Sequence, residues 1–364
     1  MTELLSSHFV TLTLIGALQV VMLGFIGGLL SGFIGSGGAF FLTPGMMNLG
    51  IPGLVTVGSN VAHKFGTAMI GSKKHAEMGN VDKKLGIFVI LISFVGIRLA
   101  IWISMLVKGG GASHIEGGGD IASNLYISAV FISILSFVAG YMLLDVLKSR
   151  KNGESGGPSM KLANFLGNLY LPPYITFPVA DIKISLWIVL AVGLALGYFE
   201  GTLGVSGVVG MPAMIYIFGV PTAVATGTEL YVAMLMGAFT AVNYAYQGFV
   251  DIRLTLLLYL GSLLGVYIGA YGTKVVKEVL IRIVTGTIIL LCVVSRAIAV
   301  PVYFRQLGWI NINPGYDLYF NMASKVMLFF AGISGGLLIL YNVIKAYLQR
   351  RKIQITLFKA QEAA

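Results

Sequence analysis

Two glycine-rich segments of this chain combine residue types and a spacing that could hold a small anion. Residues 32–38 read G-F-I-G-S-G-G, and residues 201–207 read G-T-L-G-V-S-G. Both lie in apolar sequence, so each is expected to break a membrane helix and leave backbone N–H groups that lipid cannot satisfy. The start of a half-helix presents such donors with the positive end of the helix dipole, which favours an anion. Ser36 and Ser206 would add hydroxyl donors.

These glycines do not form a nucleotide-binding motif. A P-loop needs Lys followed by Ser or Thr, and a dinucleotide fingerprint needs a βαβ unit; neither accompanies the glycines here. Close packing of membrane helices also uses small residues and is the alternative to substrate binding. The doubled string, followed both times by glycine, a hydrophobic residue and proline, favours substrate binding.

The two segments belong to longer blocks that repeat in a fixed register. The following pairs are each 169 residues apart: Gly35 and Gly204, Gly38 and Gly207, Pro52 and Pro221, Gly58 and Gly227, Gly79 and Gly248, and Asp82 and Asp251. Pro44 and Pro212 are 168 apart. Repeated apolar segments interrupted by glycine and proline are the best sequence indication of a secondary transporter's binding site. We expect helix breaks at Pro44, Pro52, Pro212 and Pro221.

Each block also carries a polar cluster after its second break. The clusters are Ser59, Asn60, His63 and Lys64 in the first block, and Thr226, Thr228, Glu229 and Tyr231 in the second. Ionisable residues inside a membrane are costly and are functional candidates by default. With the glycine strings, the expected substrate-binding residues are Gly35, Ser36, Gly37, Gly38, Ser59, Asn60, His63, Lys64, Gly204, Ser206, Gly207, Thr228 and Glu229.

The ionisable side chains of these clusters suggest separate roles. Lys64 and His63 could attract an anion, and Glu229 could carry a coupled proton. Alternatively, Lys64 snorkels at the cytoplasmic interface, or Glu229 forms an internal pair with Lys64 or Arg98. Glu200, directly before the second glycine string, is another candidate acid within the membrane.

Asp82 and Asp251 end the two blocks where a loop enters the next apolar segment. Aspartate at such a position is typical of a helix N-cap, so a structural role is expected for both. The histidines show no metal-ligand spacing, and the single cysteine, Cys292, lies in an apolar run. We therefore expect neither a metal nor a cofactor.

The elements that would position these residues are membrane helices. The chain is 57% hydrophobic and 10% charged, whereas soluble domains carry about 25% charged residues. Apolar runs long enough to cross a bilayer as a helix are 12–34, 85–107, 122–147, 184–204, 254–273, 279–299 and 321–344. They lack the alternation of an outer-membrane barrel, so the predicted fold is an all-α polytopic bundle.

The basic residues predict the topology. Loops 72–84, 148–183 and 274–282 and tail 345–364 hold 17 of the 24 Lys and Arg residues, which places them in the cytoplasm. Basic cytoplasmic loops also account for the net charge of +10, so binding to nucleic acid is not needed to explain it. Two cytoplasmic segments must be separated by an even number of membrane crossings. The full spans alone do not give this number, so the short pieces 39–49 and 207–218 must be half-helices. The result is two inverted repeats, about nine full spans, an extracytoplasmic N-terminus and a cytoplasmic C-terminus.

The predicted organisation has four parts. A first repeat covers 1–147, with about four spans and half-helix 39–49, and a second covers 184–299, with about four spans and half-helix 207–218. Between them, 148–183 is a cytoplasmic linker that begins as a flexible polar segment and contains either a short interfacial helix or disordered chain. Residues 300–364 supply an extracytoplasmic loop, an extra span and a basic tail.

The paired blocks resemble the sulfite exporter TauE/SafE family of membrane transporters. The resemblance rests on G-F-I-G-S-G-G-A-F-F-L-T-P with G-I-P, G-S-N and G-N-V-D, and on their second copy, and covers about 10–107 and 184–299. The positions that match the two family motifs are Gly35, Ser36, Gly37, Gly38, Pro44, Gly50, Pro52 and Asn60, and Gly204, Ser206, Gly207, Pro212, Gly219, Pro221, Thr228 and Glu229. Glu229 departs from the neutral polar residue, often asparagine, expected there.

The resemblance implies an inner-membrane protein that moves sulfur-containing anions. We therefore expect a secondary transporter, an exporter of a small oxyanion such as sulfite or an organosulfonate, working by alternating access. The alternatives are an anion channel or a carrier for sulfate or thiosulfate, including uptake. Enzyme motifs such as H-E-x-x-H and G-x-S-x-G are missing. The expected partners are the anion and the lipid bilayer, with a homo-oligomer allowed and no nucleic acid.

Overall fold

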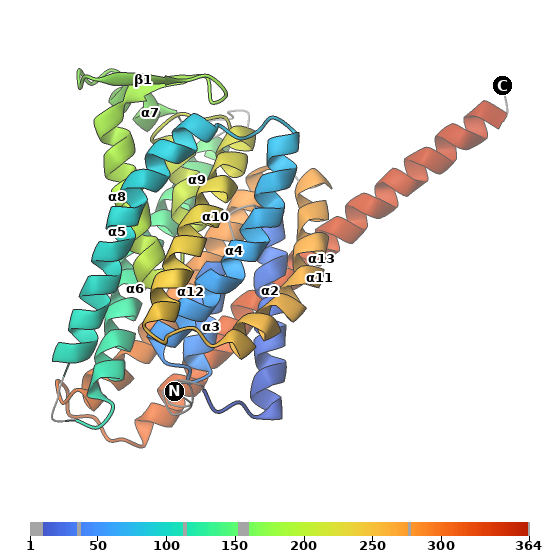
Figure 1. Cartoon of the computed structure of the whole chain (residues 1–364). Helices are drawn as coiled ribbons and strands as arrows, with labels where there is room; N and C mark the ends of the chain where they lie inside the picture. The colour runs from blue at the N-terminus through green and yellow to red at the C-terminus, as the bar shows by residue number, and fades with distance from the viewer. Residues whose placement is uncertain (1–9, 35–37, 112–114, 152–159, 276–277, 363–364) are drawn as a thin grey trace.

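The computed structural model of the chain describes residues 10–34, 38–111, 115–151, 160–275 and 278–362. Within these ranges it holds twelve α-helices and one β-hairpin, so the predicted polytopic helical bundle is confirmed (Figure 1). The elements are α2 Leu14–Ile34, α3 Ala39–Asn48, α4 Gly53–Glu77, α5 Lys83–Gly110, α6 Gly118–Lys151, α7 Lys161–Gly167, β1 Tyr174–Phe177, β2 Ile182–Ser185, α8 Leu186–Leu203, α9 Gly207–Tyr216, α10 Thr222–Tyr246, α11 Ile252–Val275, α12 Glu278–Gln306 and α13 Tyr316–Glu362.

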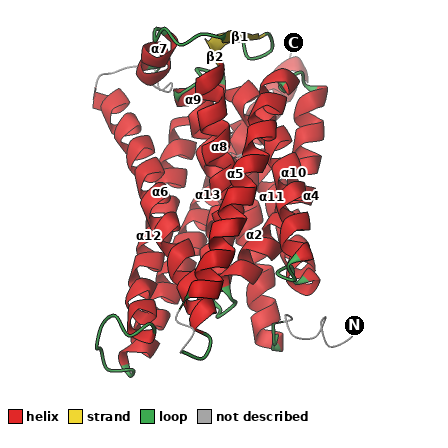
Figure 2. Ribbon diagram, turned by 60° about the vertical axis from the view of Figure 1, so that its left-hand side comes forward, coloured by secondary structure: helices red, strands yellow, loops and turns green. Residues whose placement is uncertain are grey.

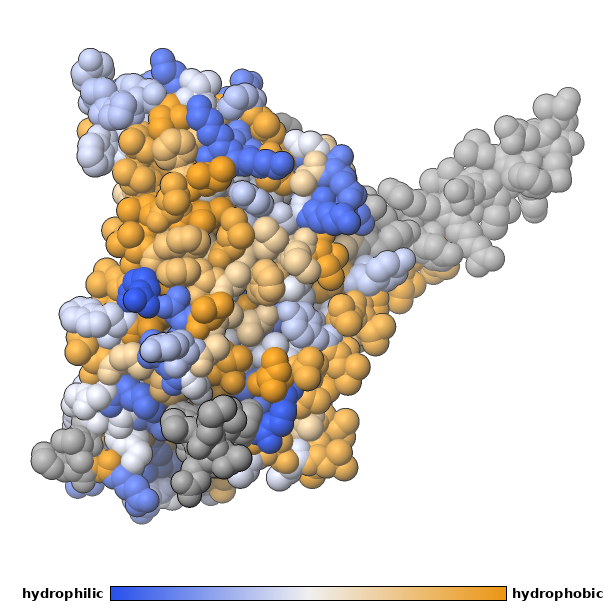
Figure 3. Space-filling model, in the orientation of Figure 1, coloured by the Kyte–Doolittle hydropathy of each residue, from blue (hydrophilic) through white to orange (hydrophobic). Residues whose placement is uncertain are grey.

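Most of these helices have the length and composition of membrane spans. Eight described helices are long and apolar enough to cross a bilayer. A ninth helix, α4, has 25 residues but carries polar and basic side chains along its length, including His63 and Lys64. Apolar residues cover the middle of the visible face, and hydrophilic residues gather mostly toward its two ends (Figure 3). This distribution is that of a multi-pass membrane protein.

The two shortest apolar helices fold back beside the helices that precede them. Helices α3 and α9 have 10 residues each, half the length needed to span a bilayer. Helix α9 ends at the end of the bundle that carries α7, where a Cβ at Gly219 would lie 3.4 Å from Cβ of Ala163. Helix α3 ends at the opposite end, where the backbone N–H of Gly53 donates to Oδ1 of Asn124 at the start of α6 (2.7 Å) (Figures 1 and 2). The two hairpins α2–α3 and α8–α9 therefore enter the bundle from opposite ends.

The prediction that all four prolines break helices is wrong for two of them. Pro52 and Pro221 precede α4 and α10 with nearly identical backbone angles, φ −55° and −56°. Pro44 and Pro212 instead lie inside α3 and α9. A proline removes one backbone donor from a helix, and these short helices, packed among longer ones, continue past it.

Glycines allow two pairs of helices to pack with their backbones in contact. Helix α2 packs along α11, where a Cβ at Gly28 would lie 2.5 Å from the carbonyl oxygen of Ser262. Helix α8 packs along α5 in the same way, where a Cβ at Gly197 would lie 2.1 Å from the carbonyl oxygen of Ser93. Packing through small residues is the usual means by which membrane helices approach closely. The same kind of packing also involves glycines of the two strings, because a Cβ at Gly32 would lie 2.3 Å from the carbonyl oxygen of Val266 and a Cβ at Gly201 would lie 2.9 Å from that of Ile97.

We expect the substitution Gly265→Ala to destabilise the fold. A Cβ there would lie 2.2 Å from the backbone oxygen of Phe25, so α2 and α11 would have to separate, at a cost of about 1–3 kcal/mol. The measurement is the thermal midpoint of the purified protein in detergent. Gly140→Ala is the control, because a Cβ at Gly140 meets no atom within 4 Å. Equal midpoints for the two variants would contradict the expectation.

The segment that joins the two halves of the chain is more ordered than its sequence indicates. Its residues 152–159 lie outside the described ranges. A short helix, α7, is present in this segment, where the sequence left open an interfacial helix or disordered chain, and Phe165 is exposed on it. The β1–β2 hairpin, which the sequence analysis missed, follows with antiparallel pairing of Tyr174 to Ser185. It covers one end of the bundle, where Phe177 is buried (Figure 2).

The last helix is longer than the expected extra span. Helix α13 runs 47 residues and extends well beyond the bundle (Figure 1). Its start lies close to the end of α12, so the connection is only 307–315 instead of the predicted 300–320. The first two turns of α13 are mostly exposed, and Ser324 is the first buried residue of this helix.

Candidate functional site

The second glycine string is a helix break in the middle of the bundle. Helix α8 ends at Leu203, and Gly204 follows with a left-handed backbone (φ +71°) that favours glycine. Ser206 and Gly207 then begin α9. Of the first string, Gly38 precedes α3, whereas Gly35, Ser36 and Gly37 lie outside the described residues. A Cβ at Gly38 would lie 1.9 Å from the carbonyl oxygen of Gly27, so α3 starts close beside the middle of α2.

The two breaks touch each other through side chains of α3 and α4. The Thr43 hydroxyl on α3 donates to the carbonyl oxygen of Leu203 at the end of α8 (2.9 Å). The Asn60 amide on α4 donates to Oγ1 of Thr43 (2.9 Å) and to the carbonyl oxygen of Ala39 (3.4 Å). Asn60 therefore contacts α3 directly and is linked to the end of α8 through Thr43.

Lys64 lies one helical turn further along α4 and is bound to the second break. Its ammonium group forms an ion pair with Glu200 and donates to Oγ of Ser206 (2.8 Å) and to the carbonyl oxygen of Gly204 (3.5 Å). Only 4% of Lys64 is exposed. The alternative that Lys64 snorkels at an interface is therefore wrong. Its charge is held in the interior beside an acid from the other repeat block.

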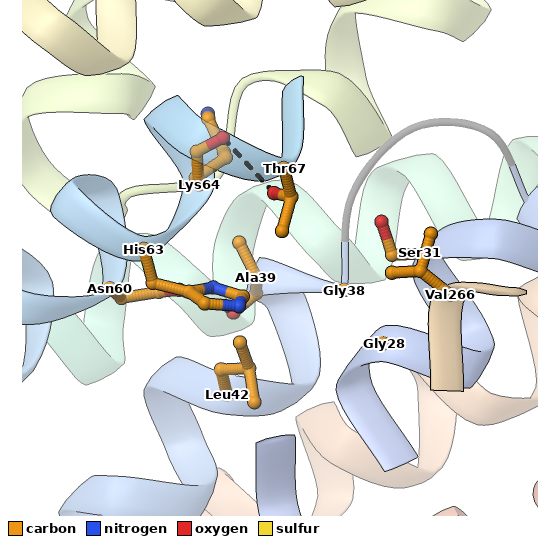
Figure 4. A pocket seen from close by; sticks show the side chains of 10 residues that line it. All are labelled: Gly28, Ser31, Gly38, Ala39, Leu42, Asn60, His63, Lys64, Thr67 and Val266. Atoms are coloured by element: carbon orange, nitrogen blue, oxygen red, sulfur yellow. Dashed lines mark hydrogen bonds between the residues drawn. The ribbon is translucent and has the colours of Figure 1, made fainter. Parts of the chain in front are cut away.

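His63 faces the first break from the other side of α4. Its Nε2 is 2.7 Å from Oγ of Ser262, and its ring packs against that of Tyr259 at a centroid distance of 4.8 Å. His63, Asn60, Lys64 and Gly38 line a small cavity. In Figure 4, His63, Ala39 and Leu42 lie on one side of it, and Gly28, Ser31 and Val266 on the other.

This central cavity is almost closed. It has a volume of about 10 Å³, which is roughly the space that one water molecule needs. A sulfite ion is larger than a water molecule. Binding such an ion here would therefore require the helices that line the cavity, among them α2, α3 and α4, to move apart or the Lys64 side chain to shift.

Glu229 is a buried carboxyl group near the second break, and it forms no ion pair among the described residues. It is 1% exposed, and neither carboxyl oxygen has a hydrogen-bond partner among the described residues. Glycine at position 210 makes room for it, because a Cβ there would lie 2.3 Å from Oε2 of Glu229. The expected alternative pairs are not formed: Lys64 pairs with Glu200, and Arg98 donates to Asn243.

Of the expected site residues that the structure describes, Gly38, Asn60, His63 and Lys64 line the central cavity, whereas Ser59, Gly204, Ser206, Gly207, Thr228 and Glu229 do not. The Ser59 hydroxyl accepts from the backbone N–H of Asp251 (3.0 Å), and the Thr228 hydroxyl accepts from the backbone N–H of Asp82 (3.0 Å). Each hydroxyl thus satisfies a buried donor of the other repeat block. Their polar character reflects packing between the blocks, where buried donors need partners.

Asp82 and Asp251 hold the starts of α5 and α11. Oδ1 of Asp82 accepts from the backbone N–H of Leu85 (2.9 Å) at the start of α5. Oδ1 of Asp251 accepts from the backbone N–H of Arg253 (3.0 Å), and the Arg253 guanidinium contacts both carboxyl oxygens. Burial alone would raise the pKa of the Asp251 carboxyl, but hydrogen bonds from Arg253 and Val10 lower the pKa below its usual value.

Two site residues were missed by the sequence analysis. Thr43 joins the breaks, and Ser262 binds His63. Ser262 lies in an apolar run with no local motif, so nothing nearby in sequence marks it. Thr43 directly precedes Pro44 in a predicted half-helix, and that position was the available signal. Within the described residues, no group of three or more His, Cys, Asp or Glu side chains could hold a metal ion.

Comparison with known proteins finds one family and one relative that are similar to the chain. The family described as sulfite exporter TauE/SafE matches residues 20–296 of the chain. The "Probable membrane transporter protein YjnA" of Bacillus subtilis (strain 168) is 25% identical over 256 residues, which is 70% of this chain and 89% of that protein. No solved structure matches the chain significantly.

Proposed function

The chain belongs to the sulfite exporter TauE/SafE family, and from this premise we propose that it exports a small sulfur-containing oxyanion such as sulfite or an organosulfonate. As a member of that family it is a multi-pass membrane transporter. Substrate and direction are parts of the proposal. We further place it in the cytoplasmic membrane, with the N-terminus outside and the C-terminus inside, because the basic loops then face the cytoplasm.

One observation carries the proposal. Asn60 and Lys64, one helical turn apart on α4, contact the starts of the half-helices α3 and α9, respectively. Helix starts favour anions through their free N–H groups and dipoles, and Lys64 adds a positive charge. This arrangement can hold a small anion from two sides without any metal or cofactor.

Matched contacts in the two halves support an inverted repeat. Ser59 and Thr228 are 169 residues apart in sequence, and each binds the N-capping aspartate of the other half. The packing of α2 on α11 is likewise matched by that of α8 on α5. Hairpins that enter from opposite ends are what an inverted repeat produces.

Alternating access would exchange which end of the bundle opens to the closed central cavity. The anion would displace part of the Lys64 contact with Glu200, and the hairpin on one side would move to admit it. Glu229 beside this region would take up or release the proton that couples transport to a gradient. The anion and the surrounding bilayer are the only partners this mechanism needs, and oligomerisation is allowed but not required.

Uptake of radiolabelled sulfite into proteoliposomes tests the proposal. We expect saturable uptake that responds to an imposed proton gradient and is reduced by unlabelled organosulfonate. Sulfate, thiosulfate and phosphate serve as competitors, and empty liposomes as the control. Uptake of another oxyanion in place of sulfite would contradict the proposed identity of the substrate. Unitary currents in electrical recordings would show that the protein is an anion channel and not a carrier.

A further inference from the structure

A second polar cavity lies at the end of the bundle where α3 and α12 end and α13 begins. Its volume is about 390 Å³, within the usual range of small-ligand sites. Its lining includes the side chains of Asn48, Tyr303, Gln306, Asn321 and Lys325. No acidic side chain is among the described residues that line it. The cavity is therefore polar and carries a positive charge.

A buried arginine lies behind this lining. Arg296 is 1% exposed and lies about 15 Å along α12 from its end, at 1.5 Å per residue. Its guanidinium donates to Oδ1 of Asn48 (2.8 Å), Oγ of Ser128 (2.6 Å) and the hydroxyl of Tyr303 (2.9 Å). Asn48 and Tyr303 also line the cavity, so they connect the arginine to it.

No carboxylate neutralises Arg296 among the described residues. The five ion pairs they form all involve other cations, and Nε of Arg296 has no hydrogen-bond partner there. A buried charge without a counter-charge is costly. Neutral oxygens from Asn48, Ser128 and Tyr303 offset only part of that cost, and an anion in the adjacent cavity would offset more.

From these observations we propose that the cavity is a second oxyanion site, in which Lys325 contacts the anion and Arg296 acts through Asn48 and Tyr303. The family match ends at residue 296, whereas Tyr303, Gln306, Asn321 and Lys325 all lie beyond it. Of these, Asn321 and Lys325 lie on the C-terminal helix α13, which completes the site. Its use as the outer release site for the exported anion rests on the proposed function; its ability to bind an oxyanion does not.

The oxyanion could be a free solute or the phosphate group of a lipid, because both present the same charged oxygens. Equilibrium binding of labelled sulfite and sulfate to the full chain in nanodiscs distinguishes these sources. In nanodiscs of neutral phosphatidylcholine, we expect Lys325→Gln to weaken the affinity of one binding component at least about tenfold. A tenfold loss of affinity corresponds to about 1.4 kcal/mol of lost binding free energy. Lys345→Gln is the control, since Lys345 lies on the same helix far from the cavity and should bind like the unchanged protein.

A lipid source predicts a different pattern in the same experiment. Adding phosphatidylglycerol would then abolish the Lys325-dependent solute component. Native mass spectrometry would show a bound phosphatidylglycerol that Lys325→Gln loses. Either pattern supports an oxyanion site. Equal binding of solute and lipid by the Lys325→Gln and Lys345→Gln variants would overturn it. Lys325-dependent binding without sulfite transport would overturn the proposed function instead, so the two failures can be told apart.

Discussion

Glu229→Gln is expected to abolish the response of transport to a proton gradient while leaving transport itself measurable. Glutamine has nearly the same shape, so it fits the space that Gly210 leaves open. It cannot exchange a proton, however. With one coupled proton, a gradient of about one pH unit supplies about 1.4 kcal/mol, equal to a tenfold accumulation ratio. The variant should lose this accumulation and should transport the anion only down the anion's own concentration gradient.

The measurement is anion accumulation in proteoliposomes with and without an imposed pH difference. Glu77→Gln is the matched control, because Glu77 is exposed at the end of α4 and should leave coupling intact. Wild-type accumulation by Glu229→Gln would remove Glu229 from the coupling mechanism. Its burial without a partner would then need another explanation.

The sequence indicated the half-helices well because glycine and proline mark their ends locally. The expected pieces 39–49 and 207–218 correspond to α3 Ala39–Asn48 and α9 Gly207–Tyr216. Glycines with a left-handed backbone, such as Gly50 (φ +87°) and Gly219 (φ +77°), end the two short segments in the same way. Such local constraints are visible without knowledge of the tertiary structure.

Partners across the bundle were not predictable in the same way. Lys64 and Glu200 are 136 residues apart, and no periodic pattern joins them. Ser59 and Thr228 looked like substrate contacts because a polar residue near a helix break can face either a ligand or a neighbouring backbone. Only the packing of α4 and α10 against the starts of α11 and α5 decides that they bind Asp251 and Asp82.

The buried pair Lys64–Glu200 yields the largest expected effect. Lys64→Met leaves the Glu200 charge unpaired in the interior, which costs about 3–5 kcal/mol, so the yield of folded protein should fall sharply. Adding Glu200→Gln removes that charge and should restore the yield, measured as monodisperse protein on size-exclusion chromatography. Lys108→Met is the control, because its ion pair with Asp120 is partly exposed and such pairs contribute at most about 1 kcal/mol.

Transport by the double variant separates the structural role of Lys64 from its role in binding. If Lys64 supplies the positive charge for the anion, Lys64→Met/Glu200→Gln should fold and yet transport sulfite at least about tenfold more slowly, since a charge-assisted hydrogen bond is worth about 1.5–3 kcal/mol. Transport at the wild-type rate would show that Lys64 only neutralises Glu200. The anion would then have to be held by the helix starts and Asn60 alone, and the positive charge on α4 would belong to the fold.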